Sequence, residues 1–457
     1  MPENPSECAC RSGGSDLSDD TRESRLSSRL DRRELLKLGG MALTGTAAAS
    51  ILAACGGPAA PPSAAAPVSA APPSAAASKP AAAASSAAPK PAASAASSAQ
   101  SSASGQKIVK AAFVYLGTAN DKGWTNAHDD GRKYLEQQLK GQVETTFAEN
   151  VPEAAESQRV FEDFAQKGYN VVYGTSFGYM DFMLAAAQKY PDVKFEHNTG
   201  FKTASNLSTY GAAQEDARYV AGIISGKMTK SNVMGFIGSF PIPEVIRDMN
   251  GWARGVQSVN PQAKIRMVWI NSWFDPPKET TAANSLLDLN ADVLASVTDS
   301  PAMAQAAAAK KRYSVGSDSD QTSYAPDYML ICPFWVWGIH YVKSVQSILS
   351  GAWKNNQVYY HMKDGVSSIT DPNAKVVPAD VAKLATDAIA GLKAGTLDIW
   401  KGPLKDNKGN VIVPDGKSIG DAFKGTPLPG QTAADGYVQS EQMNWALDNV
   451  IGDIPKS

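Results

Sequence analysis

Aromatic and acidic side chains gather in five short stretches, each at the end of an apolar run. The stretches are GTANDKGW (117–124), TSFGYMD (175–181), NSWFDPPKE (271–279), VTDSP (297–301) and GSDSDQ (316–321). Aromatic faces can sandwich a flat ligand, and carboxylates accept hydrogen bonds from the donors on its edge. The pattern therefore predicts a site that binds a flat polar molecule.

The candidate ligand-binding residues come from these stretches and from two neighbouring runs. They are Tyr115, Asp121, Trp124, Ser176, Phe177, Tyr179, Trp273, Phe274, Asp299, Asp318, Asp320 and Trp335. Each aromatic taken alone is equally consistent with packing between a strand end and the next helix. The convergence of several on one predicted edge favours binding. Of Trp335 and Trp337, we expect one in the cleft and the other in the core.

Residues suited to catalysis or metal binding are sparse. The chain has four histidines, none at metal-ligand spacing, and we expect His128 and Asp129 at a helix surface or in capping roles. His197 follows an apolar run, which is consistent with a cleft position or a buried one. Cys332, in YMLICPFW, is expected to be a buried apolar residue. We predict no cofactor, no metal ion and no enzymatic activity; the alternative is an extracellular nucleoside hydrolase or phosphorylase.

Strand and helix patterns alternate from Lys107 onward, and these elements must position the candidate residues. Strands are predicted at 108–116, 143–147, 170–175, 193–197, 232–238, 264–270, 292–297 and 329–334, with helices between most of them. The order in 107–228 is repeated in 231–314. Such alternation indicates parallel sheets with helices on both faces. We therefore predict an α/β fold of two lobes, with the ligand cleft between them at the carboxyl ends of the strands.

The pattern is weaker beyond residue 342. Helices are predicted at 341–353 and 378–397, and a small hairpin at 402–416 with its turn at Lys408 and Gly409. We expect this tail to return to the first lobe. The predicted division is a first lobe at 107–230, a second lobe at 231–330, and a crossover and C-terminal segment at 331–457 that completes the lobes.

The N-terminal residues have the features of an export signal. Arg32 and Arg33 precede a moderately apolar segment that ends in LAAC at Cys55, which resembles a Tat lipoprotein signal peptide over 1–54 with lipid on Cys55. An uncleaved membrane anchor is the alternative, because the segment approaches the roughly 20 residues of a span. Residues 55–106 are rich in Ala, Pro and Ser and predict a disordered linker. In both cases we expect the folded part outside the cytoplasm and tethered to the membrane.

Seven longer motifs occur in the folded part: NDKGWTNAHDDGR, TSFGYMD, FEHNTGFKT, ARYVAGIISGKM, GFIGSFPIPEV, NSWFDPPKE and GSDSDQTSYAPD. Together they resemble the Bmp, or PnrA-like, family of ABC-transporter substrate-binding lipoproteins. The resemblance implies the type I periplasmic-binding fold. It also implies that purine nucleosides bind between two aromatic rings, with aspartates holding the ribose.

The correspondence with that family is close but incomplete. Trp124 and Trp273 match its two aromatic positions, and its GxDxDQ motif matches Gly316, Asp318, Asp320 and Gln321. The chain departs by having Trp and Thr where nucleoside binders have Phe and Asn, and by lacking an aspartate in TSFGY. Ribose hydroxyls need such carboxylate acceptors. The Trp-containing version of the motif resembles a subgroup of the family that binds a free purine base such as adenine. The resemblance therefore implies a purine base as the ligand, with a purine nucleoside as the alternative.

The expected partners follow from the charge and the resemblance. A formal net charge of −2 gives no indication of nucleic-acid binding. The resemblance implies a small-molecule ligand, an ABC permease in the membrane and a monomeric state. A sensor that reports the same ligand to a membrane receptor is the alternative function.

Overall fold

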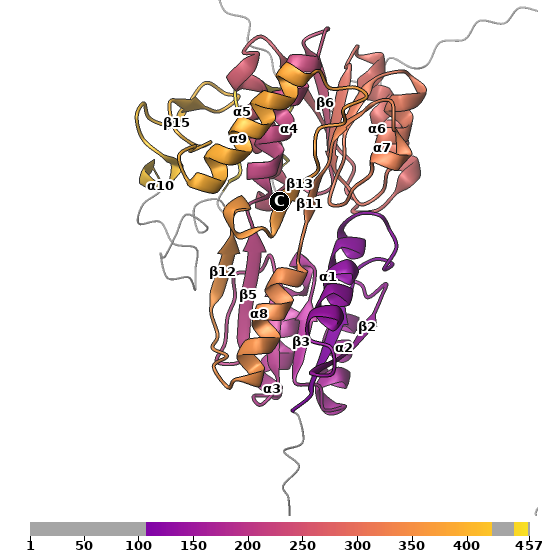
Figure 1. Ribbon diagram of the computed structural model, residues 1–457, viewed down its shortest axis with the longest axis vertical. Helices are drawn as coiled ribbons and strands as arrows, with labels where there is room; N and C mark the ends of the chain where they lie inside the picture. Colours follow the sequence, from indigo (N-terminus) through magenta and orange to yellow (C-terminus); the bar gives the residue numbers. More distant parts are fainter. Residues whose placement is uncertain (1–106, 423–442, 456–457) are drawn as a thin grey trace, which may run out of the picture. The chain divides into compact units, whose positions relative to one another are not determined.

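The computed structural model of the protein describes residues 107–422 and 443–455 (Figure 1). The predicted signal peptide, Cys55 and the linker lie outside the described residues. Within the described ranges, no helix has both the length and the apolar character that a membrane span requires.

The first lobe is built on a parallel sheet of six strands in the order β12-β5-β4-β3-β1-β2. Its strands are β1 Val109–Val114, β2 Val143–Ala148, β3 Val171–Gly174, β4 Lys194–Asn198, β5 Leu207–Ala212 and β12 Gln357–Tyr360. The inner strands β3 and β5 are buried along their whole length, as expected for a parallel sheet covered on both faces.

The second lobe repeats this architecture with the order β10-β9-β8-β6-β7-β16, again parallel throughout. Its strands are β6 Val233–Gly238, β7 Lys264–Trp269, β8 Val293–Val297, β9 Tyr313–Val315, β10 Met329–Ile331 and β16 Val450–Ile451. The predicted two-lobed α/β fold is thereby confirmed.

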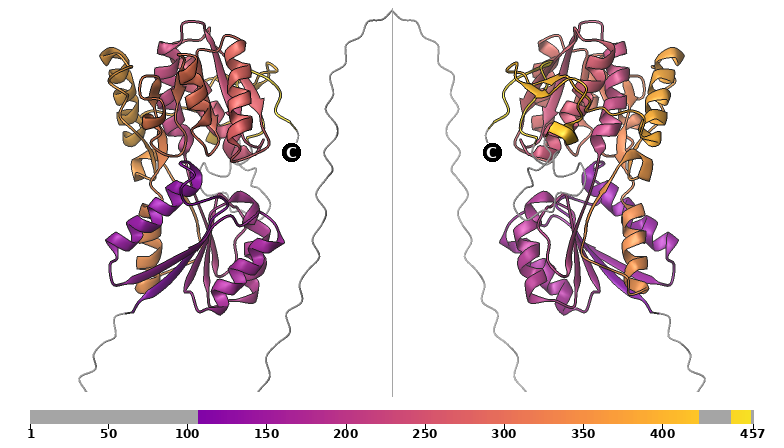
Figure 2. Two further views of the ribbon diagram at one scale, coloured as in Figure 1. Left: turned by 90° about the vertical axis from the view of Figure 1, so that its right-hand side faces the viewer. Right: turned by 90° about the vertical axis from the view of Figure 1, so that its left-hand side faces the viewer.

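Helices cover both faces of each sheet (Figure 2). The first lobe has α1 Trp124–Gln138 and α8 Gly338–Leu349 on one face, and α2 Ala155–Gln166 and α3 Met180–Lys189 on the other. The second has α4 Gln214–Met228, α5 Pro243–Val259 and α9 Ala379–Ala394 on one face, and α6 Pro276–Asp288 and α7 Ala302–Ala309 on the other. Short helical turns are η1 Phe177–Tyr179, η2 Thr322–Tyr324, η3 Met362–Asp364 and α10 Ile419–Ala422.

The segment predicted as one strand at 329–334 is divided between two sheets. β10 completes the second sheet, whereas β11 (Pro333–Trp335) pairs antiparallel with β13 (Ser367–Ile369). Figure 1 shows β11 and β13 between the two lobes, where the chain crosses from one to the other. This crossing brings Trp335 to the region between the lobes.

Two expectations about the placement of helices and tail need correction. Helix α4 falls in the range assigned to the first lobe, yet its buried residues pack in the core of the second lobe. The tail was expected to return to the first lobe, and α8 and β12 do so. Beyond β12, however, α9, the hairpin of β14 (Leu404–Lys405) and β15 (Val411–Val413), and β16 pack on the second lobe. The hairpin itself is confirmed, and Gly409 adopts a φ of 89° in its turn.

Candidate ligand-binding site

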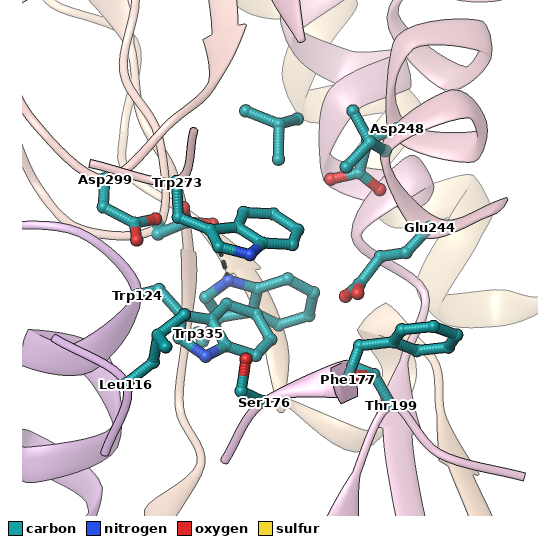
Figure 3. A pocket seen from close by; sticks show the side chains of 13 residues that line it. Leu116, Trp124, Ser176, Phe177, Thr199, Glu244, Asp248, Trp273, Asp299 and Trp335 are labelled. Atoms are coloured by element: carbon teal, nitrogen blue, oxygen red, sulfur yellow. Dashed lines mark hydrogen bonds between the residues drawn. The ribbon is translucent and has the colours of Figure 1, made fainter. Parts of the chain in front are cut away.

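A pocket of about 470 Å³, partly open to solvent, lies between the lobes at the carboxyl ends of their strands (Figure 3). The first lobe contributes Leu116, Trp124, Ser176, Phe177 and Thr199. The second contributes Glu244, Val245, Asp248, Trp273, Val297, Asp299 and Asp318, and the crossing strand β11 contributes Trp335. Its position, at the strand ends between two α/β lobes, is where folds of this kind bind small molecules.

Three tryptophans give the pocket its aromatic walls. Trp124 opens α1 and donates its indole N–H to the carbonyl of Thr175 at 2.6 Å. Its ring stands at 87° to that of Trp335, with centroids 5.6 Å apart, so a flat ligand can stack on only one of these two faces. Figure 3 shows Trp273 above both of them. All three rings line the same pocket, so each offers an aromatic face to a ligand bound there.

Trp335 is fixed by the loop that follows β9. Its indole N–H donates to Asp318 Oδ1 at 2.7 Å, and its ring stacks on buried Trp337 at 4.7 Å. One tryptophan of this pair thus lines the pocket while the other belongs to the core. The orientation of the aromatic wall depends on the acidic residue beside it.

The carboxyl groups of the pocket are held in an environment that disfavours their charge. Burial raises the pKa of Asp299 well above its usual range, and the nearby Asp121 and Asp318 raise it further. Burial also raises the pKa of Asp318, against the opposing effect of Arg218. Crowded, desolvated carboxyls are relieved by hydrogen-bond donors. The pocket therefore favours a ligand rich in N–H or O–H groups.

Several predicted residues lie outside the pocket, and these are corrections. Tyr115 and Tyr179 are fully buried in the first-lobe core, and the Tyr179 hydroxyl donates to the Val151 carbonyl at 2.5 Å. Leu116 lines the pocket where Tyr115 was expected, because successive side chains alternate in direction at a strand end.

Asp121, Phe274 and Asp320 also have other placements. Asp121 caps α1 by accepting hydrogen bonds from the backbone N–H groups of Gly123, Thr125 and Asn126. Phe274 is 49% exposed beside Trp273, and Asp320 is exposed and accepts from the Thr322 N–H. The structure brings to the pocket Trp124, Ser176, Phe177, Trp273, Asp299, Asp318 and Trp335.

Other pocket residues were missed by the sequence analysis. Glu244 and Asp248 lie one turn apart on α5, and Thr199 follows β4. The spacing of four residues between two acids in the helix after β6 was an available signal, because such residues share one helix face. Thr199 has a positive φ of 60°, which its sequence position does not reveal.

The histidines are structural. His128 was expected at a helix surface, but it is fully buried, lies 2.6 Å from the Tyr341 hydroxyl through Nδ1, and stacks on Trp337. Burial lowers its pKa well below the usual value. His197 is buried with its Nε2 2.7 Å from the Ser176 carbonyl, and burial lowers its pKa to about 4. In the part of the chain that is described, no group of His, Cys, Asp and Glu side chains could hold a metal ion.

Cys332 is fully buried, as predicted. Burial raises the pKa of its thiol to about 11, so the thiol is protonated at neutral pH. A protonated buried thiol is a poor nucleophile, which agrees with its role as an apolar core residue.

The lobes touch each other at the mouth of the pocket. The Lys122 carbonyl accepts hydrogen bonds from Gln321 Nε2 at 3.1 Å and from the Ser319 hydroxyl. A Cβ built on Gly123 would lie 2.4 Å from the backbone oxygen of Asp299, so the two backbones are in close contact there. The structure is thus that of a closed cleft.

A two-lobed α/β fold with parallel sheets and a pocket at the strand ends between the lobes is the type I periplasmic-binding-like architecture. The sequence model of the Bmp family, described as "ABC transporter substrate-binding protein PnrA-like", matches residues 108–388. The chain therefore belongs to the Bmp family, as its motifs predicted. This family comprises substrate-binding proteins of ABC transporters, and it is not a family of enzymes.

The chain is also similar to individual proteins and to solved structures. A purine-binding protein of Brucella abortus is 41% identical over 320 residues, which cover 70% of this chain and 91% of the relative. A putative ABC transporter glucose-binding protein of Haloferax volcanii is 37% identical over 296 residues, which cover 64% of this chain and 74% of the relative. A solute-binding protein structure from Aeropyrum pernix K1 has a TM-score of 0.56 at 17% identity over 65% of this chain and 93% of that one. The last similarity concerns the fold alone.

Proposed function

We propose that the protein binds a purine base such as adenine in this pocket and delivers it to an ABC permease. The observation that carries the proposal is that three tryptophans, Trp124, Trp273 and Trp335, line one pocket together with carboxyl groups (Figure 3). A heteroaromatic base offers two flat faces for the rings and N–H donors for the carboxyls. The purine-binding relative from Brucella abortus supports the same ligand class.

A purine nucleoside is the second candidate. Four carboxyl groups line the pocket, namely those of Glu244, Asp248, Asp299 and Asp318, and ribose hydroxyls are donors that such groups accept. The loop after β3 supplies Ser176 and Phe177 but no acid, which favours the base. A sensor function for a membrane receptor would use the same pocket.

Calorimetric titration tests the ligand. The purified protein, unfolded and refolded to remove any carried ligand, is titrated with adenine, guanine, hypoxanthine, adenosine, guanosine, ribose, glucose and mixed amino acids. We expect tight binding of a free base and weak binding of its nucleoside. Tight nucleoside binding would favour the second candidate, and binding of glucose with none of the purines would overturn both.

Replacing Trp273 by alanine is expected to weaken purine binding by about 1–3 kcal/mol, the usual scale for stacking of a base on an aromatic ring. Trp273 is half-buried and contacts Phe240 at a ring distance of 5.2 Å, so the fold should persist. Titration calorimetry measures the loss. Phe274→Ala is the matched control, because its exposed ring is next in sequence and outside the pocket. Equal effects of the two substitutions would contradict the stacking role.

We further propose that the chain is exported, carries lipid on Cys55 and acts as a monomer tethered outside the cytoplasm. The proposal rests on the twin-arginine segment and the LAAC sequence. In the native host, mass spectrometry of the parent is expected to find an N-terminus at lipid-modified Cys55, and Cys55→Ala should lack the lipid. Retention of residues 1–54 in the parent would favour an uncleaved anchor.

A further inference from the structure

Two buried polar atoms of the pocket have no hydrogen-bond partner among the described residues. They are Oγ1 of Thr199 and Oδ1 of Asp248, and both side chains line the pocket. Their residues are only 6% and 2% exposed, so bulk water does not readily satisfy them. Burying a polar group without a hydrogen-bond partner is unfavourable. Such atoms in a binding pocket indicate where a ligand makes its hydrogen bonds.

Asp248 is held from behind by a buried arginine. Its Oδ2 lies 3.6 Å from Nε of Arg218, which is fully buried on α4. The guanidinium of Arg218 also donates to the Gly316 carbonyl at 3.3 Å and to the Ser317 hydroxyl at 3.0 Å. The arginine therefore orients one carboxylate oxygen and leaves the other for the pocket. Its positive charge favours the ionised form of Asp248, which can only accept hydrogen bonds.

Thr199 is held in a backbone conformation that a β-branched residue rarely adopts. Its φ is 60°, a left-handed conformation that is sterically unfavourable for a β-branched side chain. Its backbone N–H donates to the Tyr210 carbonyl at 2.8 Å. A Cβ on the next residue, Gly200, would lie 1.7 Å from His197 Nδ1, so the turn is closely packed. The surrounding structure thus maintains a strained residue at the pocket wall.

The two atoms lie in different lobes. Figure 3 shows Asp248 and Thr199 on one side of the tryptophans and Asp299 on the other. We propose that Asp248 and Thr199 form a specificity-determining edge of the pocket, where Asp248 accepts a hydrogen bond from an N–H of the bound heterocycle and Thr199 donates to an acceptor on the same edge. The inference rests on the proposed purine binding. It restricts the ligand to flat heterocycles with an unsubstituted N–H donor at this edge.

Methylated purines test the donor. The protein is titrated with adenine, 6-(dimethylamino)purine and 9-methyladenine, each of which presents a different set of N–H groups. One of the two methylated compounds is expected to bind the parent at least about tenfold more weakly than adenine, because a carboxylate would be left without its donor. In Asp248→Asn, adenine itself should bind at least about tenfold more weakly. In this variant, the difference in affinity between adenine and that methylated compound should shrink to about threefold or less.

Asp320→Asn is the matched control, because this carboxyl is exposed outside the pocket, and it should bind all three compounds as the parent does. The inference is overturned if Asp248→Asn discriminates between the compounds as the parent does, or if the parent binds all three equally. Failure of the parent to bind any purine would also overturn the proposed function, so the two failures are distinguishable.

If Asp248→Asn does not fold, Thr199→Val decides: weaker adenine binding is expected, and unchanged binding overturns the inference.

The pH dependence of binding is an independent readout. Burial raises the pKa of Asp248 to about 7. The nearby Arg218 and Arg247 oppose this rise, whereas Glu215 and Asp318 add to it. Because an N–H donor requires the carboxylate, adenine affinity should fall as the pH is lowered through 7 and Asp248 takes up a proton. The decrease should be smaller in Asp248→Asn. An identical pH profile in parent and variant would contradict the contact.

Discussion

Replacing Gly123 by valine is expected to weaken ligand binding at least about 100-fold, or roughly 2.7 kcal/mol, while both lobes stay folded. Gly123 precedes α1 at the mouth of the pocket, and a Cβ there would lie 2.4 Å from the Asp299 oxygen and 2.5 Å from its Cα. These are backbone atoms that no side-chain rotation can move. The valine side chain therefore prevents the lobes from closing.

Closure matters because each lobe holds only part of the site. Trp124, Phe177 and Thr199 come from the first lobe, whereas Trp273 and Asp248 come from the second. A ligand bound to an open form contacts one lobe. The apparent dissociation constant rises as the closed, binding-competent fraction falls. Loss of closure thus removes half of the pocket without removing any of its residues.

Titration calorimetry measures the affinity of Gly123→Val, and small-angle scattering with and without ligand measures closure. Asn120→Val is the matched control, because Asn120 is exposed in the same loop and the same side chain is introduced there. The control should bind and close as the parent does. Parent-like affinity of Gly123→Val would show that the backbone contact is not required for binding.

The parallel architecture was predictable because it depends on local patterns. Buried apolar runs such as β1, β6 and β8 alternate with amphipathic helices, and each run could be read from its own residues. β5 (LSTYGA) and β12 (QVYY) were missed because they contain polar residues at positions that the sheet nevertheless buries or half-buries. Among the described residues, β12 pairs only with β5, which lies about 150 residues earlier in the sequence. β5 lies between β4 and β12 in the sheet.

The site was predictable only in part, for geometric reasons. Inspecting the residues after each strand found Trp124, Trp273 and Asp299, because parallel strands end at one edge of the sheet. That rule cannot give side-chain direction, so it failed for Tyr115. The rule also considers only the loop after each strand, so it missed Asp248, which lies on the second turn of α5.

Long-range packing determined the placement of His128. The imidazole is buried because α8 lies across α1, and its partner Tyr341 is 213 residues away in sequence. Nothing in the local sequence NAHDDG distinguishes this buried histidine from an exposed one. The same packing places the His128 ring against Trp124 at 4.8 Å, so the interior of the first lobe supports the pocket wall.

Substitution of Gly222 by alanine is expected to lower the free energy of unfolding by about 3 kcal/mol, at the upper end of the usual cost of overpacking. Helices α4 and α5 cross here at very short distance. A Cβ on Gly222 would lie 2.2 Å from the Trp252 carbonyl oxygen and 2.9 Å from the Cα of Gly255. The added methyl group therefore meets backbone on the facing helix, and the two helices must separate.

Two effects of opposite sign compete in this substitution. Alanine is the better helix former by about 1 kcal/mol, which would stabilise an isolated helix. Separation of the helices loosens the core that contains Trp252, Val256 and Ile224, all of them buried. It also displaces Arg218 and Asp248, which face each other across the same pair of helices. The packing loss exceeds the gain in helix propensity because neither backbone can give way locally.

Urea denaturation followed by circular dichroism measures the loss of stability. Gly391→Ala in α9 is the matched control, because the added methyl group would meet side-chain atoms rather than backbone, namely those of Leu397 at 3.1 Å and Thr396 at 3.7 Å. The control should stay within about 1 kcal/mol of the parent, since helix propensity offsets a small side-chain adjustment. If Gly222→Ala were as stable as this control, the close crossing of α4 and α5 would not be essential to the second lobe. If it were less stable but bound purine with unchanged affinity, the geometry of Arg218 and Asp248 would tolerate movement of the helices.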